Sequence, residues 1–399
     1  MPAGTDAATE RRPRARASVA RRLLAATALL PLIAAPAAAQ DWRVEEVAVQ
    51  AAYFGQSGRG AQSQADVCVI DGVERGSEEL DVYQPSFRVA LRQNARVRHV
   101  ATIPVDIVTS ASADALDAVS SASRVNEALE LDLRTEWRPT DDDALTFRYG
   151  AHIEEYLKGG FGGLAYAREL AQDNATLRAG VDLFVDAFDP LTPQGLDLGF
   201  TKRSALHAFV GGSQILSPTT VASLGYDLTY QWGRLEQVWN SLPTDRRVVR
   251  PGEIFPGTRL RHALSAELRQ HVPATRSTLH AGYRYYRDDF GLDAHTLELE
   301  LYQWLGRRLY VRGGYRLHDQ SAVDFFTTWV PPRVHEDADP RTADSDLAAF
   351  RAHEWSLRLV LFTSLDGERG RESISIGFSR YDRPHLDVDA VMIGYRWER

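Results

Sequence analysis

An alternation of apolar and polar residues, with a period of two, runs along this chain from about residue 44. Residues 296–301, for example, read Thr-Leu-Glu-Leu-Glu-Leu. Successive side chains of an extended strand point to opposite faces, so the pattern predicts strands with one apolar and one charged face. A soluble β-sandwich also alternates, but its inner face would not carry arginine and glutamate. The alternation therefore favours a sheet with lipid on one side and water on the other.

About sixteen such segments follow one another, each near the length that a tilted membrane-spanning strand requires. The connections between them alternate between short turns and long segments, and the long ones fall at 55–79, 110–123, 189–203, 235–257 and 325–352. Tight periplasmic turns and larger extracellular loops are typical of outer-membrane barrels. The sequence therefore predicts an all-β fold, a transmembrane antiparallel β-barrel of about sixteen strands of the outer-membrane type.

The first 39 residues have the pattern of a secretory signal peptide. Six arginines between positions 11 and 22 form a basic region, Leu23 to Ala35 form an apolar one, and small residues at 37–39 predict cleavage after Ala39. Residues 40–399 are then expected to form a single barrel domain. No later apolar run approaches the length of a membrane-spanning helix. We therefore expect export to the periplasm and insertion into the outer membrane of a Gram-negative bacterium.

Charge and cysteine content exclude some classes of function. The signal segment has a net charge of +4, so its removal lowers the formal charge of the chain from −8 to −12. An acidic balance of this size argues against a nucleic-acid partner. The single cysteine, Cys68, provides neither a disulfide framework nor a cysteine-built zinc site. No pattern in the sequence predicts a cofactor.

Several runs are similar to those of a known bacterial family. They are Tyr53–Gly58, Thr109–Ser112, Asp117–Ser123, Gly282–Gly291 and Ala294–Thr296. Together they resemble the family catalogued as domain of unknown function 3570, and the resemblance covers nearly all of the mature chain. It implies an outer-membrane β-barrel. The family has no assigned reaction or solute, so the resemblance implies no functional residues.

The polar face of the strands is the first candidate site. Its lumen-lining candidates are Arg284, Glu298, Glu300, Arg312, Arg316, Arg358, Glu130, Asp132 and Arg134, with Arg88, Arg92, Arg148, Asp182, Asp227 and Arg269 as further members. One interpretation is a charged pore that selects solutes. The alternative, which we favour for any single residue, is a lumen in which arginine and carboxylate neutralise each other across neighbouring strands.

Aromatic residues near strand ends are expected to form the girdles that meet the membrane interfaces. The residues that fit this pattern are Tyr283, Tyr285, Tyr302, Trp304, Tyr395 and Trp397. The last strand alternates from Val391 to Trp397, and such terminal strands are typical of barrels that the outer-membrane assembly machinery inserts.

Other constellations carry weaker signals. The serine-rich loop at 109–123 and the acidic stretch at 335–346, with Asp344 and Asp346, offer oxygen ligands for a cation, although solvated loops are the favoured interpretation. The glycines between Gly159 and Gly163 predict a hairpin turn. No Gly-x-Ser-x-Gly motif is present, so nothing in the sequence favours a hydrolase and no catalytic residue is assigned.

These observations predict an outer-membrane barrel with a charged lumen, acting as a channel or as the partner of another envelope protein. An outer-membrane enzyme that acts on lipid or surface polymer is the first alternative, and a secreted soluble β-protein is the second. The expected partners are outer-membrane lipid and the barrel-assembly machinery.

Overall fold

The computed structural model describes residues 42–58, 80–103, 129–153, 157–188, 199–236, 242, 252–327, 339–366, 370–384 and 386–399. They belong to one compact unit, Trp42–Arg399. The predicted signal at 1–39, Cys68 and the serine-rich loop at 109–123 lie outside the described residues. Within the described ranges, no helix is long and apolar enough to cross a membrane.

Sixteen strands make up the unit, as the alternation predicted. Their bounds are β1 Arg43–Gly58, β2 Leu80–Arg92, β3 Val97–Ile103, β4 Leu129–Trp137, β5 Asp143–Ile153, β6 Leu157–Leu170, β7 Ala175–Phe188, β8 Thr201–Ser217, β9 Thr220–Gly233, β10 Thr258–Val272, β11 Ser277–Asp288, β12 Asp293–Trp304, β13 Leu309–Gln320, β14 Phe350–Asp366, β15 Gly370–Arg383 and β16 Leu386–Glu398. A 3-10 turn, η5, covers Ser345–Leu347.

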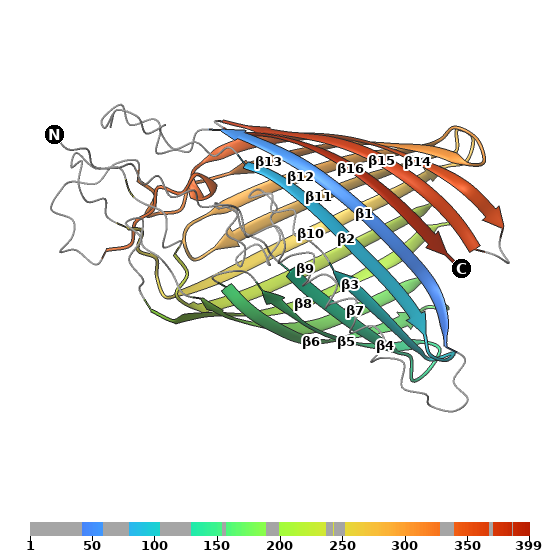
Figure 1. Ribbon diagram of the computed structural model, residues 1–399, viewed down its shortest axis with the longest axis horizontal. Coiled ribbons are helices and arrows are strands. Elements are labelled where there is room, and N and C mark those ends of the chain that lie inside the picture. The colour runs from blue at the N-terminus through green and yellow to red at the C-terminus, as the bar shows by residue number, and fades with distance from the viewer. Residues whose placement is uncertain are drawn as a thin grey trace, which may run out of the picture. The chain divides into compact units, whose positions relative to one another are not determined.

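Every strand pairs antiparallel with its sequence neighbours, and β1 pairs with β16 to close the barrel (Figure 1). The closed ladder leaves no sheet edge without a hydrogen-bonded neighbour, which is what a sheet in lipid requires. The predicted all-β antiparallel barrel of about sixteen strands is therefore confirmed.

The two ends of the barrel differ in their connections. Even-numbered strands are followed by short connections at 93–96, 138–142, 171–174, 218–219, 273–276, 305–308 and 367–369, and we call this end the turn end. Odd-numbered strands lead into the connections at the opposite end, the loop end, which include 234–257 and 321–349. The C-terminus lies at the turn end (Figure 1).

The outer face of the barrel is apolar because the outward positions of each strand carry large hydrophobic side chains. Leu297, Leu299 and Leu301 of β12 are 39%, 46% and 43% exposed, although a soluble fold would bury them. Equivalent outward rows run along β7, β14 and β15. The alternation therefore separates an apolar outer face from a charged inner face.

Aromatic residues and ion pairs bound this apolar face at the loop end. Tyrosine hydroxyls hydrogen-bond the Nδ1 atoms of histidines on the neighbouring strand in three hairpins: Tyr226 with His262 at 2.7 Å, Tyr283 with His295 at 2.7 Å and Tyr315 with His353 at 2.8 Å. Closer to the loops lie the ion pairs Arg287–Asp293, Arg351–Asp319 and Arg380–Asp389, at 3.9, 2.6 and 3.2 Å. Rings with a polar tip suit an interface between lipid and water.

The glycine run was predicted wrongly as a hairpin turn, because Gly159, Gly160, Gly162 and Gly163 lie within β6. Two of them, Gly159 and Gly163, provide space for side chains of β7. A Cβ on Gly163 would lie 1.9 Å from Oδ1 of Asp182, and one on Gly159 would lie 2.2 Å from a carboxylate oxygen on the same neighbouring strand, β7. The glycines therefore let the inward carboxylates of β7 lie flat against the wall.

Candidate functional site: the barrel interior

The nine predicted lumen-lining residues all occupy inward positions of their strands. Glu130, Asp132 and Arg134 lie on β4, Arg284 on β11, Glu298 and Glu300 on β12, Arg312 and Arg316 on β13, and Arg358 on β14. Whether they line a solute path stays a prediction. The structure shows which partners each one has, and eight of these nine residues form an ion pair with another described residue.

Strands β11 to β14 carry the densest group of these pairs. Glu300 pairs with Arg312 on the next strand, and His280 lies 3.4 Å from the same carboxylate. Arg316 lies 3.3 Å from Glu298 and 4.0 Å from a second carboxylate on β14, so one guanidinium spans three strands. Ion pairs between adjacent strands hold the long side chains against the wall and away from the barrel axis.

A second group lies on strands β4 to β9. Asp132 accepts hydrogen bonds from Arg134 at 3.1 Å and from Arg148 on β5 at 3.0 Å. His207 on β8 lies between Asp182 and Asp227, at 3.5 and 3.1 Å. Each carboxylate here faces at least one cationic or protonatable neighbour. The pairing agrees with the self-neutralised lumen that was the favoured interpretation of single residues.

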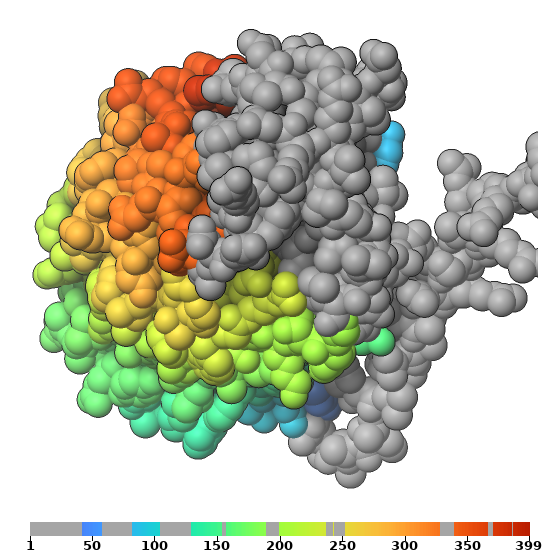
Figure 2. Space-filling model, turned by 90° about the vertical axis from the view of Figure 1, so that its left-hand side faces the viewer, coloured from blue at the N-terminus to red at the C-terminus, as the bar shows by residue number. Residues whose placement is uncertain are grey.

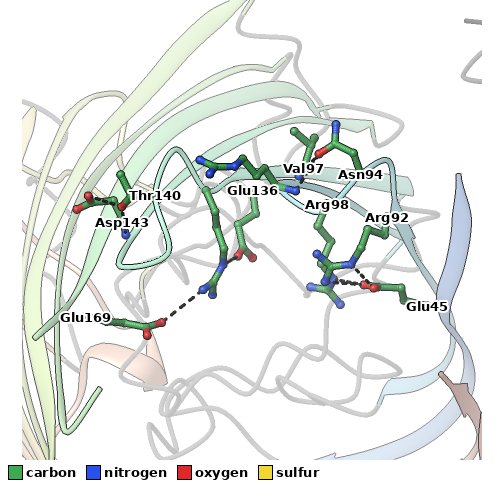
Figure 3. A network of polar contacts seen from close by, with 11 residues as sticks. Glu45, Arg92, Asn94, Val97, Arg98, Glu136, Thr140, Asp143 and Glu169 are labelled. Atoms are coloured by element: carbon green, nitrogen blue, oxygen red, sulfur yellow. Dashed lines mark hydrogen bonds and ion pairs between the residues drawn. The ribbon is translucent and has the colours of Figure 1, made fainter. Parts of the chain in front are cut away.

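The turn end contains a wide charged cavity that we call the vestibule. It has a volume of about 680 Å³, and its lining includes Glu45, Glu46, Arg92, Arg98 and Arg396. A β-bulge between Val44 and Glu46 turns both glutamates inward, where Arg92 and Arg98 reach Glu45 (Figure 3). A strict period of two places consecutive residues on opposite faces of a strand. It therefore cannot predict two adjacent inward residues, and Glu45 and Glu46 were not predicted.

Two residues of the predicted aromatic girdle face the interior instead. Tyr302 and Trp304 share the inward side of β12 with Glu300, and the Tyr302 hydroxyl donates a hydrogen bond to that carboxylate at 2.8 Å. The Trp304 ring stacks on Phe362 at 5.8 Å between centroids and contacts Tyr310 at 5.2 Å. Their position near a strand end is typical of a girdle, but the period of two assigns them to the lumen.

Arg358 is the exception among the nine residues. Its guanidinium lies 3.8 Å from the sulfur of Met392, and within the described part of the chain it pairs with no carboxylate. Its cross-strand neighbour on β13 is Arg312, which is occupied by Glu300. An arginine without a carboxylate partner inside a wet barrel keeps its hydrogen-bond donors available for a solute.

Segments from the connections of the loop end pack together over one side of the mouth, and we call residues 252–257, 289–292, 321–327 and 339–349 the cap. Phe290 lies 5.9 Å from Phe255 and 5.0 Å from Phe325, between ring centroids. The Val323 N–H donates to the Leu347 carbonyl at 3.0 Å. In Figure 2, which looks onto this end, yellow and orange atoms of these segments form a continuous surface.

The acidic stretch contributes to the cap. Asp344 accepts the Asp346 N–H at 2.9 Å and begins η5, and the Asp346 carboxylate lies 2.6 Å from Arg383. Among the described residues, no group of three or more histidine, cysteine or acidic side chains is arranged to hold a metal ion. The part of the stretch at 335–338 lies outside the described residues.

The stability of the cap is expected to depend on pH through Asp344. Burial, and then the nearby Asp346 and Glu253 carboxyls, raise the pKa of Asp344 well above its usual range. Such a carboxyl stabilises the fold while it is protonated, and this contribution is lost as the pH rises through the folded-state pKa. We expect hydrogen exchange at residues 345–348, corrected for its intrinsic rate, to quicken from acidic toward neutral pH. Asp344→Asn keeps the hydrogen-bond acceptor and should remove this dependence, and an unchanged pH profile in that variant would contradict the assignment.

Family membership follows from the sequence match over this barrel. A model of the family described as "Protein of unknown function (DUF3570)" matches residues 128–384, which is more than half of the chain and contains β4 to β15. The chain belongs to this family. The motifs at 282–291 and 294–296 lie inside the matched range, whereas those at 53–58 and 109–123 precede it. No curated protein matches the chain.

The DUF3570 barrel is also similar to solved outer-membrane structures. A bacterial polysaccharide outer membrane secretin is 8% identical with a TM-score of 0.43, covering 88% of this chain and 98% of that one. A FadL homologue of Pseudomonas aeruginosa is 10% identical with a TM-score of 0.43, covering 90% of each chain. OpdK of Pseudomonas aeruginosa is 10% identical with a TM-score of 0.42, covering 89% of this chain and 98% of that one.

Proposed function

We propose that this protein is a channel in the Gram-negative outer membrane that lets small hydrophilic solutes cross through its charged interior. The observation that carries the proposal is the separation of the two faces of one closed sheet. Exposed leucines such as Leu299 and Leu357 cover the outside, while paired arginines and carboxylates line the inside. A barrel of sixteen strands is wide enough for an aqueous path.

The apolar outer face and the terminal strand indicate the partners of the channel. Outer-membrane lipid would surround the apolar face between the aromatic residues of its two ends. The barrel-assembly machinery would insert the exported chain and recognise the terminal strand, in which Val391, Ile393 and Tyr395 alternate on the outer face. The vestibule opens at the turn end, where another envelope protein would meet the channel on its periplasmic side.

Conductance in a planar bilayer tests the proposal, after a heat-modifiability gel has shown that the barrel is folded. We expect a stable conductance. Glu298→Ala should shift the ion selectivity toward anions, because it leaves Arg316 with only its weaker partner at 4.0 Å. The control is Gly313→Ala on β13, the strand of Arg316, where a Cβ would meet no atom within 4 Å. A folded barrel that conducts no ions would refute the proposed channel.

A further inference from the structure

We propose that a pocket in the turn-end part of the lumen binds a small aromatic carboxylate, with Arg358 holding the carboxylate group and the rings of Tyr310 and Phe362 stacking on the aromatic group. The inference rests on the proposed channel, since the solute would reach this pocket through the lumen.

The pocket lies where β13, β14, β15, β16 and β1 face the interior. Its volume is about 300 Å³, and the side chains that matter are Arg358, Arg371, Tyr310 and Phe362, with the hydroxyls of Ser373 and Ser375. This volume is at the lower end of the range for small-molecule sites and suits a single ring with one substituent. Arg371 and Arg396 line both the pocket and the vestibule, so the two spaces adjoin.

The charges of the pocket favour an anion. Its two carboxylates are already engaged, because Arg396 lies 3.2 Å from Glu46 and 2.9 Å from Glu398. Glu46 is shared further with Arg88, at 3.3 Å. Arg358 and Arg371 pair with no carboxylate among the described residues. The lining of the pocket therefore has a net positive charge. A guanidinium presents paired N–H groups that match the two oxygens of a carboxylate.

The Arg358 side chain lies beside Gly377 of β15, its cross-strand neighbour. A Cβ at Gly377 would lie 3.5 Å from Arg358 Nε and 3.4 Å from the Met392 methyl group. A Cβ there would only touch the arginine, and the guanidinium extends across β15 to the sulfur of Met392 on β16, at 3.8 Å. Ser375 and Ser373 follow on the same inward row, so hydroxyl donors continue the polar side of the pocket.

The aromatic side of the pocket is held in place from behind. Tyr310 and Phe362 have ring centroids 6.2 Å apart, and Trp304 stacks on Phe362 with an interplanar angle of 17°. Such a preformed wall of rings favours a planar aromatic group over a flexible aliphatic chain, because aromatic pairs gain stabilisation beyond the area that they bury. The wall and Arg358 line the same pocket, so one molecule can engage both.

Equilibrium dialysis of radiolabelled benzoate against the detergent-purified protein tests the site without any need for conductance. We expect saturable binding that Arg358→Ala weakens about 10- to 100-fold, as the loss of a charge-assisted hydrogen bond implies. The matched control is Arg269→Ala, which removes an inward but exposed arginine paired with Glu267 at 3.6 Å on β10, outside the pocket. This control should leave benzoate binding unchanged.

Two competing ligands separate the parts of the proposal. Benzyl alcohol, which lacks the charge, and cyclohexanecarboxylate, which lacks the aromatic ring, should each bind more weakly than benzoate. Should Arg358→Ala fail to fold, Ser373→Asp places a carboxylate in the pocket and should abolish benzoate binding. Absent saturable binding, equal affinity in Arg358→Ala, or equal affinity for cyclohexanecarboxylate would overturn the proposal. A folded barrel that binds benzoate but conducts no ions would refute the proposed channel and leave this site standing. A barrel that conducts ions but does not bind benzoate would refute this site and leave the channel standing.

Discussion

Asp288→Ala is expected to lower the free energy of unfolding by about 3–5 kcal/mol, the cost of leaving one partner of a buried ion pair alone. The Asp288 side chain is fully buried and pairs with Arg259, whose side chain is 9% exposed. The same carboxylate accepts hydrogen bonds from the Tyr286 hydroxyl at 2.7 Å and from the Phe290 and Leu292 N–H groups at 3.0 and 3.1 Å. Its loss therefore affects both the β10–β11 pairing and the turn that brings Phe290 into the cap.

Urea unfolding of the refolded barrel, followed by tryptophan fluorescence, measures this effect. The control is Asp319→Ala, which breaks the ion pair with Arg351 at the same end of the barrel, where both side chains are about half exposed or more. Exposed pairs contribute about 0–1 kcal/mol, so the control should change little. Equal losses in the two variants would show that burial of the Asp288 pair has no energetic consequence.

Ile376→Arg is expected to destabilise the inserted barrel by about 2–4 kcal/mol, the cost of an arginine that faces lipid near the middle of the bilayer. Ile376 is 50% exposed on the outward row of β15, between other exposed hydrophobic side chains. The adjacent residue Ser375 faces the lumen pocket, so Ser375→Arg adds the same side chain on the wet side and should fold normally. Folding into lipid vesicles, measured by heat-modifiability, distinguishes the two variants. A soluble β-protein would tolerate both substitutions, because Ile376 would then face water.

The fold could be predicted because its signal is local. Alternation within each strand shows which residues share a face. The face toward lipid is apolar and the face toward the water-filled interior is polar along every strand. Arg312 and Glu300 could thus be assigned to one face from the sequence. The ion pair between them could not be predicted, because it depends on the register between β12 and β13. The sequence of either strand alone does not determine that register.

The errors have the same origin. Glu45 was missed because a bulge adds one residue and breaks the period at that point. The glycines of β6 were assigned to a turn because glycine usually marks one, whereas Gly159 and Gly163 make room for carboxylates of β7. Tyr302 and Trp304 were assigned to the girdle by residue type and by position, although the period of their own strand places them with Glu300.

The seam between the first and last strands has a consequence for the order of assembly. In the β1–β16 ladder, Glu46 lies directly opposite Glu398, and like charges in that position repel each other. Arg88 on β2 and Arg98 on β3 reach Glu46 from one side, and Arg396 lies between the two carboxylates. The two ends of the sheet therefore join at lower cost once β2 and β3 have brought Arg88 and Arg98 beside Glu46. The charge pattern at the seam thus favours closure after the first three strands have formed.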